Sequence, residues 1–190
     1  SFLAEGTADP RPEFMRQLQA VLPDTGSVLV YNAAFEKGRL KECCDLLPDY
    51  RSWYRKVERR IVDLLLPFRG FRYYHPDQLG SASMKKVLPA LTGRGYGGLD
   101  IQDGARASLE FLRVSFGAVS EMERQKVRQQ LEQYCGLDTQ GMVWMSGRLM
   151  GGLTPLIWAF DVAAYVPALV TANRLPPGVP TLAVFELATT

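Results

Sequence analysis

Two short stretches of this chain, about one hundred residues apart, place carboxylates where they could bind a metal ion. Glu36 follows an apolar run at residues 28–31 and lies on the predicted first turn of a helix, just beyond the carboxyl end of a predicted strand. Tyr134 and Asp138 are four residues apart, so on a helix the phenol and the carboxylate share one face. Mg²⁺ prefers oxygen ligands and neutralises charge on phosphate oxygens. These residue types therefore point to metal-assisted phosphate chemistry.

The segments that contain these acids also resemble a known family. Asn-Ala-Ala-Phe before Glu36, and the Tyr-x-x-x-Asp segment that ends at Asp138, resemble the second and third motifs of the proofreading-exonuclease (DEDD) superfamily, tyrosine subtype. An uncharacterised bacterial branch of that superfamily, often found downstream of a PD-(D/E)XK nuclease-like domain, is similar in the segments between them, at residues 60–65, 73–76, 80–91 and 103–104. The resemblance covers residues 2–145. It implies an α/β, RNase H-like (exonuclease-type) mixed sheet flanked by helices and missing its first strands.

The resemblance implies a nuclease of 3′ to 5′ exonuclease type, acting on DNA or RNA with two Mg²⁺ or Mn²⁺ ions. Asp138 would be a direct metal ligand, and Glu36 would bind the second ion or a bridging water. Tyr134 would be the catalytic residue that orients the attacking water, because a phenol with an unperturbed pKa of about 10 is a poor base. Without the resemblance, Asp138 would be a helix-capping acid before Thr139 and Tyr134 an amphipathic core residue.

One departure from the family pattern limits what the resemblance implies. The superfamily's first motif, Asp-x-Glu, does not occur in this sequence, so two of the four expected carboxylates are missing. Glu36 also stands where the wider superfamily has aspartate. Because the first motif would precede the segment in which the chain begins, we expect a longer protein with an upstream nuclease-like domain as partner. The alternative is a catalytically degenerate module that binds or scaffolds nucleic acid.

Charge and aromatic residues are concentrated in one part of the chain. The net charge of +2 does not identify a partner, but residues 51–94 hold ten basic residues against three acids, with six aromatic residues between them. This segment could follow a phosphate backbone and stack bases, or it could be a solvated helix face with its rings turned inward. The residues expected to contact nucleic acid are Phe35, Lys85 and Lys86.

Four further residue types, asparagine, aspartate, histidine and cysteine, also bear on the candidate site and its setting. Asn32 and Asp63 are expected to surround the metal ligands. Asp63 has a second interpretation as a strand residue hydrogen-bonded to neighbouring backbone, which the usual fate of buried polar groups favours. His75, the only histidine, follows two tyrosines in an aromatic loop and is expected to be structural. The three cysteines show no metal-ligand spacing, and no secretory signal is visible, which favours a reducing, cytoplasmic setting.

Helices and short apolar strands must position these residues. Helices are expected between Pro12 and Pro23, from the first strand to Pro48, and at residues 50–59, 84–91, 104–116 and 120–134. The first strand, residues 27–32, is an unbroken apolar run typical of an interior position in a parallel sheet. Residues 60–66 are predicted to be a second buried strand, and residues 68–78 a loop or β excursion. Serine hydroxyls at residues 80–83 are available to cap the helix that follows.

The carboxyl-terminal part differs from the rest. We expect the partial exonuclease-type domain at residues 1–146 and an unmatched apolar tail, linker and terminal strand at residues 147–190. A membrane helix at residues 149–173 is disfavoured because Asp161, near its middle, would cost about 2.5–3.5 kcal/mol. A helix packed on the sheet or a partner-binding segment is expected instead, which would make the chain a protein-interaction module. The terminal strand, with Glu186 in place of the first motif's aspartate, would fill the missing first strand or begin another domain.

Overall fold

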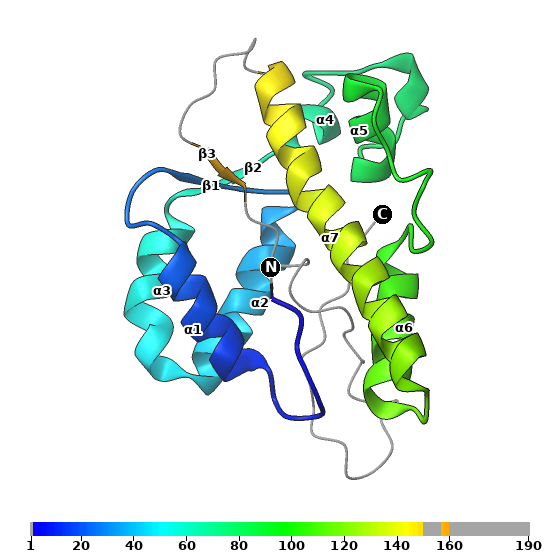
Figure 1. Cartoon of the computed structure of the whole chain (residues 1–190). Helices are drawn as coiled ribbons and strands as arrows, with labels where there is room; N and C mark the ends of the chain where they lie inside the picture. Colours follow the sequence, from blue (N-terminus) through cyan, green and yellow to red (C-terminus); the bar gives the residue numbers. More distant parts are fainter. Residues whose placement is uncertain (1, 150–156, 160–190) are drawn as a thin grey trace.

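The computed structural model of this chain describes residues 2–149 and 157–159. Helices carry most of these residues, and three short strands form one sheet (Figure 1). The elements are α1 (Arg11–Val21), β1 (Ser27–Val30), α2 (Ala33–Leu46), η1 (Pro48–Tyr50), α3 (Arg51–Glu58), β2 (Ile61–Asp63), α4 (Leu66–Arg69), η2 (Pro76–Gln78), α5 (Met84–Thr92), α6 (Gly104–Phe116), α7 (Glu121–Leu149) and β3 (Ile157–Ala159). The expected linker, terminal strand and Asp161 lie outside the described residues.

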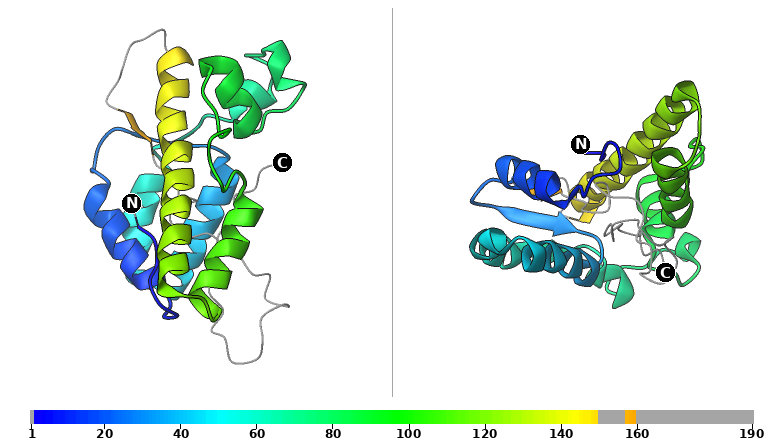
Figure 2. Two further views of the ribbon diagram at one scale, coloured as in Figure 1. Left: turned by 45° about the vertical axis from the view of Figure 1, so that its right-hand side comes forward. Right: turned by 90° about the horizontal axis from the view of Figure 1, so that it is seen from below.

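The sheet has β1 in its centre, with the strand order β2-β1-β3. Both neighbours run parallel to β1, and Val30 stands opposite Asp63 in the register with β2. Viewed from below, β1 lies between α1 on one face and α2 with α3 on the other (Figure 2). Because helices cover both faces, all residues of β1 after Ser27 are buried rather than alternately exposed. The prediction of a buried, interior parallel strand is confirmed.

The expected RNase H-like mixed sheet is wrong. Every strand pair in the described part of the chain is parallel, and the strands have only three or four residues. The apolar run at residues 60–66, expected to be one buried strand, stops at Asp63, whose carboxylate accepts the Leu65 N–H at 2.9 Å as the chain turns into α4. β2 is also an edge strand, with Val62 exposed. Residues 68–78 hold the end of α4, turns and η2 instead of a β excursion.

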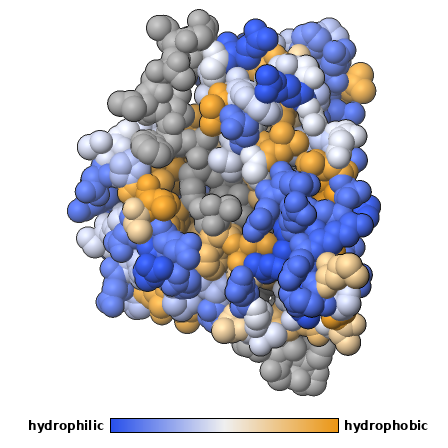
Figure 3. Space-filling view, in the orientation of Figure 1, coloured by the Kyte–Doolittle hydropathy of each residue, from blue (hydrophilic) through white to orange (hydrophobic). Residues whose placement is uncertain are grey.

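The long helix α7 organises the other half of the molecule. It runs diagonally across the structure, with α5 and α6 packed along it, and it also contacts β3 (Figures 1 and 2). Its close approach to α5 depends on Gly141, since a Cβ there would lie 2.9 Å from Leu88 Cδ2. On the face in Figure 3, hydrophilic side chains cover α6 and the lower part of α7, and hydrophobic atoms show between α5 and the middle of α7.

Some helix boundaries agree with those predicted from the sequence, and others differ. The expected helix at residues 104–116 is confirmed as α6, which Asp103 caps by accepting the Arg106 N–H at 2.7 Å. Ser83 stands at the start of α5 without a side-chain capping bond, so the expected serine cap is absent there. α7 has 29 residues and continues well past Tyr134, so the expected domain boundary after residue 146 falls inside it. Among the described helices, none is both long and apolar enough to cross a membrane.

Candidate site at the carboxyl edge of the sheet

The carboxyl ends of β1 and β2 are joined by the side chain of Asp63. Its carboxylate accepts the backbone N–H groups of Asn32 at 3.0 Å and Ala33 at 2.9 Å, in addition to that of Leu65. These bonds satisfy free amides at the start of α2, where the helix dipole also favours a negative charge. The interpretation of Asp63 as a residue hydrogen-bonded to backbone is confirmed, while a role around a metal ion stays a prediction.

Asn32 connects β1 to α2 in a left-handed conformation, with φ of 80°. Asparagine adopts this region more readily than other non-glycine residues, so the turn favours this residue type whether or not a metal is present. Tyr31, just before it, donates its hydroxyl to the carbonyl of Ala82 at 2.5 Å, which ties the sheet edge to the segment before α5. Burial, and secondarily the negative charge of Asp63, raises the pKa of Tyr31, whereas the positive charge of Arg69 opposes that rise.

Glu36 lies on the first turn of α2, as predicted, with its side chain inside the protein. It is 2% exposed. A carboxylate removed from water is costly unless polar partners or a cation compensate, and the nearby amino end of α2 supplies part of that compensation. A buried acid at the carboxyl edge of a parallel sheet is a candidate for function, because ligands of open α/β sheets bind at this edge.

Tyr134 and Asp138 lie one turn apart on α7, and both are buried. Asp138, 3% exposed, accepts a hydrogen bond at Oδ1 from the hydroxyl of Tyr96, and the rings of Tyr96 and Tyr134 are 5.9 Å apart between centroids. Asp138 stands in the middle of the helix, so its interpretation as a helix cap is wrong. Tyr134 belongs to the core, as the alternative interpretation of that residue expected.

Tyr96 is the member of this cluster that sequence reasoning missed. It comes from the glycine-rich connection between α5 and α6, and it is buried although its neighbours from Arg94 to Gly98 are exposed. Arg94 stacks over the ring of Trp144 at 4.3 Å from its centroid, which holds this connection against α7. A lone tyrosine among glycines was the available signal, since glycines allow a chain to approach a helix closely and leave a large side chain to fill the gap.

Glu36, Asp63 and Asp138 do not by themselves form the expected two-ion site. Within residues 2–149 and 157–159, no three or more His, Cys, Asp or Glu side chains lie close enough together to hold a metal ion. Asp63 directs its carboxylate to three backbone amides, and Asp138 binds Tyr96. Glu36 and Asp138 therefore do not by themselves fit a pair of Mg²⁺ or Mn²⁺ ions. His75, which accepts the Asp77 N–H at Nδ1, caps η2 and has the expected structural role.

The basic segment of the sequence does not form one surface. Its first three cations lie on α3, whereas α4 and α5 stand at the far upper corner (Figure 1). Its rings also divide, since Tyr54 and Phe68 are buried while Phe71 and Tyr74 are exposed. Of the residues expected to contact nucleic acid, Lys86 is exposed, whereas Lys85 and Phe35 are half-buried; the guanidinium of Arg39 lies 5.7 Å from the Phe35 ring centroid.

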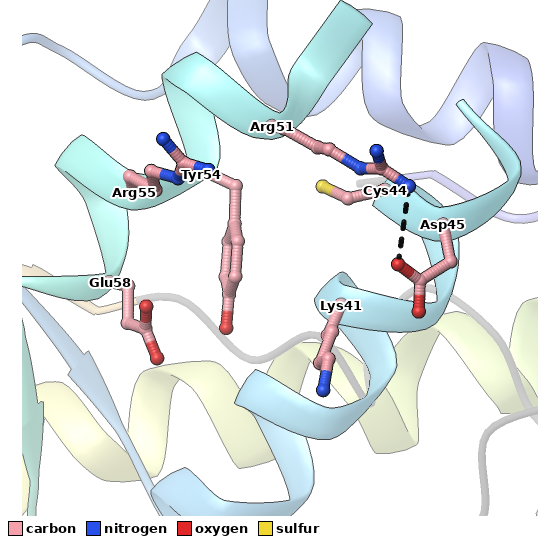
Figure 4. A pocket seen from close by; sticks show the side chains of 7 residues that line it. All are labelled: Lys41, Cys44, Asp45, Arg51, Tyr54, Arg55 and Glu58. Atoms are coloured by element: carbon pink, nitrogen blue, oxygen red, sulfur yellow. Dashed lines mark ion pairs between the residues drawn. The ribbon is translucent and has the colours of Figure 1, made fainter. Parts of the chain in front are cut away.

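A cavity of about 390 Å³ lies between α2 and α3, away from these acids (Figure 4). Its lining mixes cations and acids, and Arg51 pairs with Asp45 at 3.6 Å. The thiol that faces it, Cys44, is a weak nucleophile because burial raises its pKa. The phenol of Tyr54 donates to the carbonyl of Lys37 at 3.2 Å, and burial raises its pKa to about 12. Neither Cys44 nor Tyr54 is therefore activated as a nucleophile.

Comparison with known proteins relates only the first part of the chain to a family. Residues 1–83 match the model of a domain of unknown function (DUF2779). This match runs from before α1 to just before α5, so it includes Glu36 and Asp63 but not Tyr96, Tyr134 or Asp138. No curated protein and no solved structure matches the chain. The family's description states no activity, and the match does not establish the exonuclease assignment.

Proposed function

We propose that this chain binds nucleic acid through a basic corner formed by Arg69, Arg72, Lys85 and Lys86. These cations come from α4, from the segment after it and from the first turn of α5, which lie together in both Figures 1 and 2. Residues 66–88 hold these four cations against a single acid, Asp77. Cations concentrated on one face attract the phosphate backbone and bind it with release of counterions.

The charges of the basic corner are available to a ligand. Three of them, Arg69, Arg72 and Lys86, are exposed, and none of the four makes an ion pair with another described residue. On α3, by contrast, cations stand beside acids such as Glu58 and Asp45 around the cavity in Figure 4. The observation that carries the proposal is therefore this local excess of three positive charges, four cations against one acid.

Salt-dependent binding tests this proposal. The double variant Lys85→Gln/Lys86→Gln should lower the slope of log K against log salt concentration by about 1.4–1.8, since each phosphate contact contributes about 0.7 for single strands and 0.9 for duplex. The matched control is Arg55→Gln/Lys56→Gln, an adjacent pair of exposed cations on α3. Fluorescence anisotropy with a labelled oligonucleotide measures both. An unchanged slope in the α5 variant, or an equal loss in the α3 variant, would contradict the proposal.

A second function, metal-dependent hydrolysis of nucleic acid of 3′ to 5′ exonuclease type, is supported by the buried carboxylates of Glu36 and Asp138. Carboxylates buried in this way are common at catalytic sites. When bound, Mg²⁺ or Mn²⁺ would neutralise phosphate charge. Because the described residues do not complete a two-ion site, this function needs further ligands, for which an upstream nuclease-like domain of the same protein is one proposed source.

Manganese binding tests the second function. Titration followed by the electron paramagnetic resonance of free Mn²⁺ should show weaker binding in Asp138→Asn, which preserves the size of the buried side chain and an acceptor for Tyr96. Glu132→Gln, an exposed acid on the same helix, is the control. Equal Mn²⁺ affinity of both variants and the unaltered chain, with circular dichroism showing all three folded, would count against a metal role for Asp138.

A further inference from the structure

Two aromatic rings stand exposed beside the basic corner, on the segment between α4 and η2. Phe71 is 67% exposed and Tyr74 is 47% exposed. Their ring centroids are 5.8 Å apart and their planes are inclined by 47°. At this corner, the upper right of Figure 3, hydrophobic atoms lie next to hydrophilic ones. Rings left in water gain little from folding, so this pair calls for an explanation other than core packing.

The backbone holds this pair in a conformation that packing does not require. Phe71 has a φ of 52°, a left-handed value uncommon for a bulky residue. The turn is nevertheless well connected, since Phe71 donates its N–H to Phe68, and Arg72 and Tyr73 both donate theirs to the carbonyl of Pro67. Strained residues held by ordered surroundings concentrate at sites of function. The rings are therefore presented on a fixed turn, which reduces the entropy lost on binding a ligand.

The turn that carries the exposed pair is anchored, through Phe68, to the residue that follows β1. Phe68, buried beneath the turn, contacts both Tyr31 and Tyr73, with ring centroids 6.4 Å and 5.6 Å apart. Tyr31 directly follows β1 and donates its hydroxyl to the carbonyl of Ala82, in the segment before α5. The turn that presents the rings is therefore packed, through Phe68, on the carboxyl end of β1.

We propose that Phe71 and Tyr74 stack the bases of a single-stranded nucleic acid whose phosphates contact the basic corner. This inference rests on the proposed function, because it names the substrate class of the same surface. Bases in a duplex are stacked on each other and hidden, whereas single-stranded bases offer free faces to aromatic rings. Exposed rings beside arginines that make no ion pair with another described residue suit such a strand, since the rings contact the bases and the guanidinium groups contact the backbone.

The test compares single-stranded DNA with its duplex in EDTA, so that no cleavage can occur. Anisotropy is measured with a fluorescein-labelled oligonucleotide of about 20 nucleotides, long enough to cover the surface. The variant Phe71→Asn/Tyr74→Ala removes both rings and places at position 71 a residue that tolerates positive φ. Its control, Leu109→Asn/Met122→Ala, removes two exposed apolar side chains from α6 and α7. The rescue variant is Phe71→Trp/Tyr74→Trp.

The expected result is a loss of single-strand affinity of about ten- to hundredfold in the variant without rings. Duplex affinity and the salt dependence should stay unchanged, because the cations remain. The control and the rescue variant should bind as the unaltered chain does. Circular dichroism of each variant verifies the fold.

Three outcomes would overturn the inference. The first is unchanged single-strand binding without the rings, and the second is an equal loss for the duplex. The third is competition by polyglutamate as effective as that by the oligonucleotide, which would indicate an acidic peptide as ligand. Salt-dependent binding that is the same with and without the two rings would overturn this inference but would leave the proposed function unaffected. Absence of any binding by the unaltered chain would overturn both.

Discussion

Removal of the Asp63 side chain is expected to destabilise the protein strongly, because one carboxylate serves three backbone amides at 2.9–3.0 Å. A hydrogen bond to a charged group contributes about 1.5–3 kcal/mol. Asp63 is half-buried, so water can partly replace it, and the lower end of that range applies. Asp63→Ala should therefore lower the free energy of unfolding by about 3–5 kcal/mol, a large part of the total of about 5–15 kcal/mol.

Asp63→Asn should cost less, and the difference is the sharper test. Its amide oxygen can still accept the two bonds that Oδ1 accepts, whereas the bond from Ala33 to Oδ2 is lost. We expect a loss of about 1–2 kcal/mol. With a urea slope of about 2 kcal/mol/M, the midpoint should fall by about 1.5–2.5 M for alanine and about 0.5–1 M for asparagine. Circular dichroism during urea unfolding measures both values.

Two comparisons decide whether the reasoning holds. Asp24→Ala, which removes an exposed acid from a loop, should change the midpoint little. The losses at Asp63 should be equal in EDTA and in Mg²⁺, because the amides need no metal. If Asp63→Ala lowered the free energy of unfolding no more than Asp63→Asn, the three hydrogen bonds would not stabilise the fold as described. A loss confined to Mg²⁺ would assign Asp63 to metal binding and refute the backbone interpretation.

The remaining predictions concern packing, acid stability and thiol reactivity. Gly141→Ala should lower the free energy of unfolding, measured in urea, by about 1–3 kcal/mol, because the new Cβ would meet Leu88. Gly136→Ala, on the same helix, has open space and should raise that free energy by about 0.5–1 kcal/mol. Equal effects of the two substitutions would contradict the close approach of α5 and α7. Burial opposes ionisation of Asp9, but hydrogen bonds from Arg11 lower the pKa of this carboxyl below 3.8. The ionised Asp9 therefore stabilises the folded protein above that pH, and this stabilisation is lost as the pH falls further. Asp9→Asn should thus weaken the protein at pH 6 and leave stability nearly unaltered at the acid end of the titration, and a loss of the same size at both ends would refute this. Burial raises the pKa of Cys43 to about 12, and all three thiols are buried, so a disulfide reagent at about pH 8 should label them only on unfolding; rapid labelling of the native protein would show otherwise.

The sequence predicted much of the local structure correctly. The helix expected between Pro12 and Pro23 corresponds to α1, and the helix expected at residues 104–116 has the bounds of α6, because helix periodicity and capping depend on residues a few positions apart. The unbroken run of β1 correctly indicated a strand between two helical layers. Glu36 on a first helical turn, and Tyr134 one turn before Asp138, followed from the same local rules.

The strands and the site depended on contacts between distant residues. Asp63 ends β2 early because its carboxylate reaches amides about 30 residues away at the start of α2, and no pattern within the apolar run reports that competition. The second neighbour of β1 is β3, from a tail in which a helix packed on the sheet or a partner-binding segment was expected. The resemblance between short motifs therefore led to the wrong sheet, since motifs of a few residues do not specify strand order.

By itself, the sequence determined most of the longer helical segments, the place of Glu36 on a first helical turn, and the positive charge of residues 66–88. The tertiary structure alone decided that Tyr96 donates to Asp138, 42 residues away, and that Phe71 and Tyr74 face water while Phe68 is buried beneath them. The physical reason is that helix formation and local charge are set by near neighbours. Burial and hydrogen-bond partners are set by the path of the whole chain, which brings distant residues into contact.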